Sequence, residues 1–304
     1  MSERILVTGS AGLIGTSLCR ALRRRGVDVL EIDLRKPGKG ERGDIADVQH
    51  VSTALRQCAG VVHLAAIARV ALCEADPRSC WSTNVDGTQT VLRAAERTGA
   101  WFLFASSREV YGATTQRVVS EASPICPINA YGRSKAAAEE LVERSRSAGH
   151  AAAIVRLANV YGSIEDYSDR VVPAFVQRAV AQQPLLVEGE DRYVDFTHVD
   201  DVVEGLMLVI DELRSGLSAS PVQLVSGTAT TLGELARMVV DIARSSSAIQ
   251  HAPPRAYAVP GFCGDGTLAR TRLGWSSRVS LRDGVARMVL DMSRTAAALT
   301  EVAS

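Results

Sequence analysis

A glycine-rich turn between a strand and a helix, near the start of the chain, constrains the fold more than any other feature. The apolar run RILVT (4–8) leads into TGSAGLIG, which places Gly9, Gly12 and Gly15 just before the helical run TSLCRALRRRG. Glycines permit a tight turn and let backbone N–H groups approach a pyrophosphate at the positive end of the helix. In this strand–turn–helix context the motif predicts a dinucleotide-binding domain.

The second β-rich run, DVLEID (28–33), ends in an acidic residue that bears on the choice of dinucleotide. Asp33 lies 18 residues beyond Gly15, where its carboxylate can accept hydrogen bonds from the adenosine ribose hydroxyls and would repel a 2′-phosphate. The position therefore favours NAD over NADP as the cofactor. Arg35, two residues later, either weakens this preference or is a solvated loop cation, and the second interpretation is favoured. Asp44, in the tripeptide GDI, is either a contact to the adenine edge or a turn residue.

Short β-rich runs alternate with helical patterns through the first half of the chain. This alternation predicts an α/β fold, a Rossmann-type doubly wound parallel sheet with helices on both faces. After about residue 160 the alternation fails, which predicts a smaller α/β C-terminal substrate domain. The predicted division is 1–160 plus about 197–215 for the NAD-binding domain, and about 161–196 plus 216–304 for the substrate domain. The predicted strands are 4–8, 28–33, 61–66, 101–105 and 152–157, and the predicted helices include 84–99, 131–146 and 198–213, the last with Asp200 as its N-cap.

Composition limits the partners of the chain. Its 304 residues carry 34 basic and 34 acidic side chains, so no net charge favours binding to nucleic acid or to an anionic membrane. The start of the chain lacks a signal-peptide pattern and no apolar run is long enough to span a bilayer, so we expect a cytoplasmic protein. The six cysteines lack paired metal-ligand spacing, which favours reduced thiols, without a metal site, over a disulfide framework.

The predicted helix at 131–146 begins with the pattern YGRSK. Tyr131 and Lys135 are four residues apart, so both side chains lie on one face. An ammonium group near a phenol favours the phenolate and lowers its pKa from an ordinary value of about 10. The same pattern is common on exposed helices, where it carries no chemistry. The dinucleotide turn upstream and Ser107 at a strand end favour the interpretation of Tyr131 as a base.

Eight segments carry a resemblance to a known family. In order they are TGSAGLIG, GDI, HLAA, NVDGT, SSREVYG, YGRSK, RLANVYG and DFTHVDD. With them the sequence resembles the extended short-chain dehydrogenase/reductase family, specifically its NAD-dependent nucleotide-sugar epimerases and dehydratases. The resemblance is strongest from residue 4 to residue 205. It implies a tightly held NAD, a UDP-sugar substrate, and a homodimer formed through two helices of each subunit.

The resemblance also implies roles for individual residues. Tyr131 is implied to be the base, Lys135 to orient the nicotinamide ribose, and Ser107 to hydrogen-bond the reacting sugar oxygen. His63 is interpreted as a packed residue near the cofactor, and Asn84 as a residue that holds sheet and helix together. The implied cofactor contacts are Gly9, Gly12, Leu13, Ile14, Gly15, Asp33, Asp44, Ile45, Leu64, Ala65, Ala66, Tyr131 and Lys135.

The two residues after Ser107 separate reaction classes within the family. Sugar 4,6-dehydratases carry Thr-Asp-Glu here, with the acidic pair serving water elimination. This chain keeps Glu109 but has Arg108 in place of the Asp, which argues against an efficient dehydratase. UDP-glucuronate decarboxylases carry Ser/Thr-Ser-Glu, so Glu109 does not exclude a lyase. Arg108 is either a ligand for a substrate carboxylate, a loop contact or a solvated cation, and Glu109 is either catalytic or a structural hydrogen-bond partner.

The implied substrate contacts lie mostly in the second half of the chain. Asn159 matches an asparagine that contacts the nucleotide diphosphate, and Arg170 and Val171 match a stretch along the uridine and phosphates. The arginine that the family places directly before the later D-F/Y pair is a valine here, with Arg192 two residues earlier as a substitute. Arg255 matches a phosphate-binding arginine, although the Pro-Gly-Asp usual after it is missing. Guanidinium groups suit a diphosphate, and their surplus favours a charged sugar such as UDP-glucuronate.

The expected function is NAD-dependent epimerisation at C4 of a UDP-sugar, of the UDP-glucuronate or UDP-glucose/galactose type, through a transient 4-keto intermediate. A UDP-glucuronate decarboxylase or a nucleotide-sugar 4,6-dehydratase is the alternative. A non-catalytic NAD-sensing protein on the same fold is a third hypothesis. The intact set of Ser107, Tyr131 and Lys135 argues against it.

Overall fold

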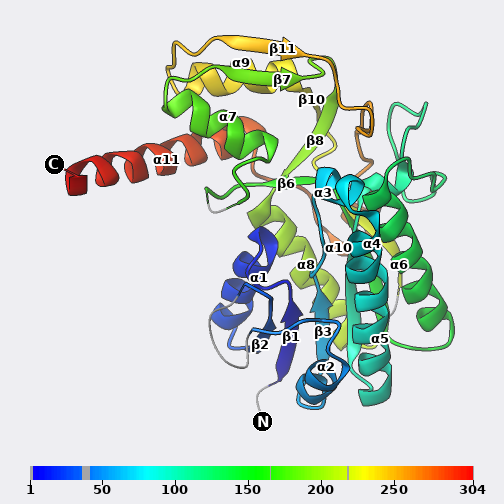
Figure 1. Ribbon diagram of the computed structural model, residues 1–304. Helices are drawn as coiled ribbons and strands as arrows, with labels where there is room; N and C mark the ends of the chain where they lie inside the picture. The colour runs from blue at the N-terminus through cyan, green and yellow to red at the C-terminus, as the bar shows by residue number, and fades with distance from the viewer. Residues whose placement is uncertain (1–2, 36–41, 165, 218, 304) are drawn as a thin grey trace.

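The computed structural model describes residues 3–35, 42–164, 166–217 and 219–303. Its central element is a six-stranded parallel sheet in the order β2-β1-β3-β4-β5-β9 (Figure 1). Because β2 and β3 lie on opposite sides of β1, the chain winds outward in both directions, which is the doubly wound arrangement predicted from the sequence. The strands are β1 (Arg4–Thr8), β2 (Asp28–Ile32), β3 (Gly60–His63), β4 (Trp101–Ser107), β5 (Ala152–Leu157) and β9 (Ala219–Leu224).

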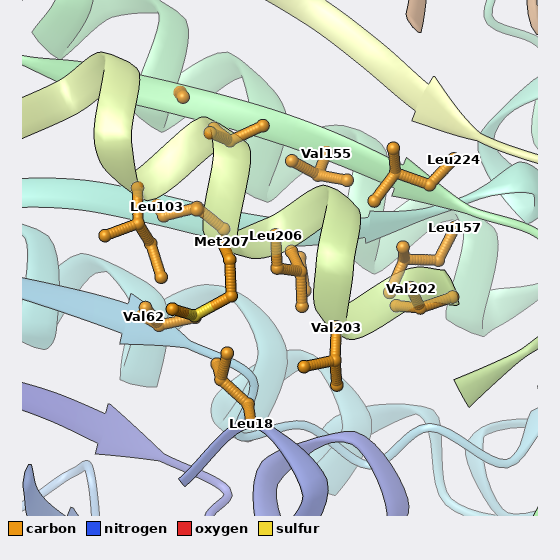
Figure 2. Packing of buried hydrophobic residues seen from close by; sticks show 14 of the residues in the cluster. Leu18, Val62, Leu103, Val155, Leu157, Val202, Val203, Leu206, Met207 and Leu224 are labelled. Atoms are coloured by element: carbon orange, nitrogen blue, oxygen red, sulfur yellow. The ribbon is translucent and has the colours of Figure 1, made fainter. Parts of the chain in front are cut away.

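Helices cover both faces of the sheet because successive strand residues point to opposite sides. On one face, Leu206 and Met207 of α8 pack among strand residues such as Leu103 and Val155, and Leu18 of α1 closes the same cluster (Figure 2). On the other face, apolar side chains from three helices pack on the alternate residues of the same strands. The first face carries α1 (Leu13–Arg24), α8 (Val199–Arg214) and α10 (Thr267–Leu273), and the second carries α2 (Val48–Leu55), α5 (Gly87–Thr98) and α6 (Ala130–Ser147).

A second group of elements has its own apolar core and lies above the six-stranded sheet in Figure 1. It contains a three-stranded sheet, β10-β8-β6, and a two-stranded sheet, β11-β7. Strand β9 pairs with β5 in the large sheet, although the predicted division placed 216–304 in the substrate domain. The two-domain division itself remains a prediction. The elements are β6 (Asn159–Tyr161), α7 (Val171–Val180), β7 (Leu185–Glu188), β8 (Tyr193–His198), β10 (Ala229–Thr231), α9 (Leu232–Ile242), β11 (Ile249–Ala252) and α11 (Leu281–Ala303).

Two helix starts differ from the prediction. The helix expected at 84–99 begins as a π-helix, Ser82–Asp86, and continues as α5. The N-cap of α8 is His198 and not Asp200, because the His198 ring nitrogen accepts a hydrogen bond from the Asp200 N–H at 3.2 Å. The imidazole thus takes the place that an aspartate side chain was expected to fill.

The expectation of reduced thiols is wrong for one pair of cysteines. A disulfide joins Cys73 of α3 (Val70–Ala75) to Cys80 of α4 (Pro77–Trp81). Both residues are buried beside Ala130 and Tyr131 at the start of α6. The two short helices turn back on each other and bring together side chains seven positions apart. The free cysteines are Cys19, Cys58, Cys126 and Cys263.

Reduction of this disulfide is expected to lower thermal stability. Closing a loop of this length removes chain entropy from the unfolded state worth about 2 kcal/mol. For a chain of this size, that corresponds to a decrease in Tm of roughly 4 °C. The measurement is thermal unfolding with and without dithiothreitol. A Cys73→Ala/Cys80→Ala double variant should show no response to the reductant, and a reductant effect of equal size in that variant would contradict the assignment.

Candidate functional site

A cavity of about 880 Å³ lies where the loops after the strands of the large sheet meet the second group of elements. Residues from both parts of the molecule line it. Every residue that the sequence singled out for cofactor or substrate contact lies on its wall. They are Gly9, Gly12, Leu13, Ile14, Gly15, Asp33, Asp44, Ile45, Leu64, Ala65, Ala66, Ser107, Arg108, Glu109, Tyr131, Lys135, Asn159, Arg170, Val171, Arg192 and Arg255.

The glycine turn forms one end of this cavity. Gly9 adopts a left-handed backbone conformation, with φ of 71°, and a Cβ there would lie 2.6 Å from the backbone nitrogen of Ala65. Only glycine fits this close approach between the loops after β1 and β3 without strain. At Gly12, by contrast, a Cβ would approach nothing closer than 3.3 Å. The turn leads directly into α1, so an anionic pyrophosphate bound there would lie at the positive N-terminal end of this helix.

Asp33 lies beside the glycine turn and stabilises it. Its carboxylate accepts hydrogen bonds from the Ala11 N–H at 3.0 Å and from the Arg35 N–H at 2.8 Å. Arg35 is exposed, as expected of a loop cation, and its guanidinium also donates to the Tyr167 hydroxyl at 2.8 Å. Asp44 is exposed and accepts a hydrogen bond from the Ala46 N–H at 2.9 Å. That contact is the turn role considered for Asp44, at a position that also lines the cavity.

The serine, tyrosine and lysine come together at the end of β4. The Tyr131 side chain is hydrogen-bonded to Ser107. Lys135 is buried one turn further along α6 and donates to the backbone carbonyl of Ala105 at 2.8 Å. A Cβ at position 132 would lie 2.5 Å from the Glu109 carbonyl oxygen, so glycine permits α6 to pack this closely against the end of β4.

Burial changes the proton affinities of both titratable groups of this set. It raises the pKa of Tyr131 to about 12, although the Ser107 hydrogen bond acts in the opposite direction. Burial also lowers the pKa of Lys135 to about 8. The expected lowering of the tyrosine pKa is therefore not found in the protein alone. The desolvation of a phenol that is fully enclosed exceeds the effect of its cationic neighbours.

Arg108 and Glu109 form a buried ion pair. The distance between Arg108 Nη2 and Glu109 Oε1 is 2.7 Å, and the two side chains are 7% and 8% exposed. Arg108 Nε also donates to the Asn159 side-chain oxygen at 3.1 Å, and Glu109 Oε2 accepts from Asn129 at 2.7 Å. The interpretation of Arg108 as a solvated cation is wrong. Glu109 is already bonded to two side chains, which restricts its freedom to act as an acid or a base.

Asn129 was not singled out from the sequence. It caps α6 by accepting a hydrogen bond from the Gly132 N–H at 2.8 Å, while its amide nitrogen donates to Glu109. One side chain thereby links the start of the tyrosine helix to the Arg108–Glu109 pair. The signal that could have identified it is its position, because asparagine immediately before a helical pattern is a preferred N-cap.

The other arginines of the cavity differ in their partners. Arg255 forms an ion pair with Glu188 at 2.6 Å, and Arg170 lies 3.6 Å from Asp166. Arg192 donates from Nε to the Val259 carbonyl at 3.1 Å, and within the described ranges no carboxylate forms an ion pair with it. Burial lowers the pKa of Arg192, and the charge of Arg108 adds to this effect. Arg192 is thus a partly desolvated cation facing the cavity, in a position to bind an anion.

The model of the NAD dependent epimerase/dehydratase family matches residues 5–224 of this sequence. This chain belongs to that family. Its sequence relatives include UDP-glucuronic acid decarboxylase 1 of Arabidopsis thaliana, which is 32% identical over 95% of this chain and 69% of the relative. The predicted family and the predicted α/β fold are therefore confirmed.

Solved structures of the epimerase/dehydratase family superpose closely on this chain. The UDP-glucose 4-epimerase of Thermotoga maritima, solved with UDP-glucose, gives a TM-score of 0.90 at 28% identity, covering 96% of this chain and 99% of that one. MoeE5, solved with UDP-glucuronic acid and NAD, gives a TM-score of 0.88 at 28% identity, covering 96% and 99% of the two chains. A further sequence relative is a dTDP-glucose 4,6-dehydratase of Streptomyces niveus, which is 31% identical over 94% of this chain and 91% of the relative. The similar proteins thus include epimerases, decarboxylases and dehydratases.

The prediction of NAD as cofactor is confirmed at the level of the family, which is NAD-dependent and several of whose solved members were crystallised with NAD. The residues present here fit that cofactor. At Gly9 the backbone lies so close to the backbone of Ala65 that a side chain would not fit. The Asp33 carboxylate lies beside the glycine turn. Within the described ranges, no helix is long and apolar enough to cross a membrane. No cluster of three His, Cys, Asp or Glu side chains in those ranges is placed to hold a metal ion.

His63 lies beneath this site and is completely buried. Its ring nitrogens lie 2.7 Å from the Thr8 hydroxyl and 3.0 Å from the Thr88 hydroxyl. Burial lowers its pKa to about 3, with a smaller contribution from the charge of Lys135. These contacts agree with its interpretation as a packed residue.

The neutral His63 predicts a particular dependence of stability on pH. Its pKa is lower in the folded protein than in the unfolded chain, so the unfolded chain binds more protons between about pH 6.5 and pH 3. The free energy of unfolding should therefore decrease as pH falls through this window. Denaturant titrations of a His63→Gln variant should show a shallower decrease than the parent protein. An exposed substitution, His251→Gln, serves as the control, and equal slopes in His63→Gln and the parent would contradict the prediction.

Proposed function

We propose that this chain epimerises a UDP-sugar at C4, with a UDP-hexose or UDP-hexuronate as substrate. The observation that carries the proposal is that Ser107, Tyr131 and Lys135 line the same cavity as the glycine turn. The engagement of Glu109 by Arg108 and Asn129 supports epimerisation over elimination, because elimination needs an additional acid and base.

In the proposed reaction, side chains of this protein accept the proton of a sugar hydroxyl and later return it. Tyr131 takes the proton from O4, while Ser107 donates a hydrogen bond to the same oxygen. Arg170 and Arg108 are cations near the tyrosine that favour its ionised form, opposing the effect of burial. Bound NAD supplies the hydride acceptor and donor. Tyr131 then returns the proton to O4, and because NAD would both accept and return the hydride, epimerisation would consume no cofactor.

The residues that support binding of the diphosphate are Arg170, Arg255 and Asn159, which line the same cavity. Arg192 supports a uronate as the sugar, because its cation has a neutral carbonyl but no carboxylate partner in the described part of the chain. We also propose NAD over NADP, from the position of Asp33, and a homodimer in the cytoplasm by analogy with the family.

A second candidate is a UDP-glucuronate decarboxylase. The sequence similarity to plant enzymes of that name and the presence of Glu109 at the end of β4 favour it. Both reactions begin with oxidation at C4. They differ after that step, because the 4-keto uronate would lose carbon dioxide in the decarboxylase and would be reduced again in the epimerase.

The experiment that separates these functions is direct product analysis. The purified protein with NAD is incubated with UDP-glucuronate and, separately, with UDP-glucose, and the products are followed by mass and by proton NMR. Unchanged mass with an inverted coupling pattern at C4 is the result expected for the epimerase. A decrease in mass corresponding to carbon dioxide or to water would replace it with the decarboxylase or the dehydratase. No conversion of either sugar nucleotide would reject all three activities for these substrates.

A further inference from the structure

The segment 166–170 lies between β6 and α7 in the second group of elements. It contacts the loops that follow β2 and β3 of the large sheet, across the cavity. The Tyr167 hydroxyl accepts a hydrogen bond from Arg35 Nη1 at 2.8 Å, over 132 positions of sequence. Asp169 forms an ion pair with Arg69, over 100 positions. All four side chains line the cavity. We refer to Arg35, Arg69, Tyr167 and Asp169 as the clasp.

The aromatic ring is the centre of the clasp. The guanidinium carbon of Arg35 lies 5.3 Å from the centre of the Tyr167 ring, and that of Arg69 lies 5.1 Å from it. Each guanidinium is thus within the distance at which a cation is attracted to the electrons of an aromatic ring. Arg35 and Arg69 come from two loops on one side of the cavity. Both therefore contact the Tyr167 ring, which comes from the other side.

Each end of the clasp is fixed by further hydrogen bonds. Arg35 is bonded to Asp33, which in turn accepts from the Ala11 N–H in the glycine turn. On the other side, the Tyr167 N–H donates to the Asp166 carboxylate at 2.9 Å and the Tyr167 carbonyl accepts from the Arg170 N–H at 3.0 Å. The clasp therefore joins two ordered turns and is not an isolated contact between mobile side chains.

The position of the clasp relates it to the cofactor. Arg35 Nη2 lies 3.6 Å from the place that a Cβ at Gly12 would occupy, so the guanidinium is directly beside the glycine turn. Arg69 follows the Leu64–Ala66 segment and precedes α3. Between them, Tyr167 and Asp169 extend the wall of the cavity along the region lined by the glycine turn and Asp33. A dinucleotide held there has the clasp across one of its sides.

We propose that the clasp retains the dinucleotide, because NAD cannot leave past Tyr167 until the ring and the Arg69–Asp169 pair separate. Retention has a chemical purpose. In a reaction that takes a hydride from the substrate and returns it, as in the proposed function, loss of reduced cofactor midway would strand the enzyme with an oxidised sugar. None of the four clasp residues needs to contact the reacting atoms; they act as positioning residues for the cofactor.

The test measures cofactor release and does not depend on the identity of the sugar. The protein is loaded with NADH, mixed with excess NAD, and the decrease in bound NADH fluorescence gives the dissociation rate. Tyr167→Ala should release NADH about tenfold faster than the parent, since it loses both ring contacts and the Arg35 hydrogen bond. Tyr167→Phe keeps the ring and should release NADH at most about threefold faster. Tyr167 is 38% exposed, so neither change should alter the fold.

Two further variants complete the test. Arg69→Gln removes one cation from the ring and the ion pair with Asp169, and should accelerate release as Tyr167→Ala does. The matched control is Arg282→Gln, which removes an exposed ion pair with Asp241 far along the chain and should leave the rate unchanged. Release from Tyr167→Ala at the parent rate would overturn the proposal. Equal rates in the Phe and Ala variants would also overturn it, because the ring would then contribute nothing. Product analysis of the parent tests the proposed sugar chemistry separately.

Discussion

Replacing Tyr131 by phenylalanine is expected to lower turnover by about 10³-fold while NAD still binds. The substitution removes the only atom of this side chain that can take a proton from a sugar hydroxyl, and a positioned base typically contributes 10²- to 10⁴-fold. The apolar packing of the ring beside Cys73 and Cys80 is kept, so the fold should persist. Steady-state turnover and NAD titration on the same preparation provide the two measurements.

Tyr111 offers a matched control for this prediction. It is another buried tyrosine, bonded through its hydroxyl to Arg156 at 3.0 Å and to Gln223 at 3.3 Å, and it does not line the cavity. Tyr111→Phe should reduce stability but leave turnover within about threefold of the parent, since it loses hydrogen bonds and no catalytic group. Turnover by Tyr131→Phe equal to that of Tyr111→Phe would exclude Tyr131 as the base.

Replacing Arg108 by methionine is expected to decrease the free energy of unfolding by about 3 kcal/mol. The substitution leaves the Glu109 carboxylate in a buried place with Asn129 as a remaining partner, and an uncompensated buried charge is strongly destabilising. Denaturant titration of the cofactor-free protein measures the effect. Adding Glu109→Gln to the Arg108→Met variant should recover part of the loss, because it removes the unpaired charge and keeps the shape of the side chain.

An exposed ion pair serves as the control for the buried Arg108–Glu109 ion pair. Arg4 pairs with Asp28 at 2.6 Å, but both side chains are more than a third exposed. Arg4→Met should therefore cost no more than about 1 kcal/mol. If Arg108→Met costs no more than Arg4→Met, the buried pair does not have the structural importance that its contacts suggest.

The sheet could be predicted from sequence because its strands are local apolar runs and its first turn has a specific glycine pattern. Strand β9 could not be predicted, because serine, proline and glutamine interrupt the apolar residues of Ala219–Leu224, and the segment becomes a strand by pairing with β5. The α8 cap was missed for a similar reason. Aspartate is the usual cap, and the choice of His198 depends on its conformation at the end of β8.

The candidate site could be predicted as a set of residues but not as a set of contacts. Arg108 and Glu109 are neighbours in sequence, and in a continuing strand they would point to opposite faces. The 3-10 helix Arg108–Tyr111 begins at this point, and their side chains meet in an ion pair. The pairing of Arg35 with Tyr167 joins positions 132 apart, for which no local pattern exists. The Cys73–Cys80 bond likewise depends on the turn between two short helices.

The late position of α8 and β9 in the chain affects how the protein can be made. Leu206 and Met207 of α8 complete the apolar layer on Leu103, and β9 covers the edge of β5. The ribosome therefore delivers the first five strands of the large sheet, and β6, α7, β7 and β8 of the second group, before α8 and β9 emerge. Until residue 224 has been synthesised, the nascent sheet has an open edge and an uncovered apolar face, which are the surfaces that chaperones recognise and that aggregation exploits. The large sheet is therefore completed only after β6, α7, β7 and β8 of the second group have been synthesised.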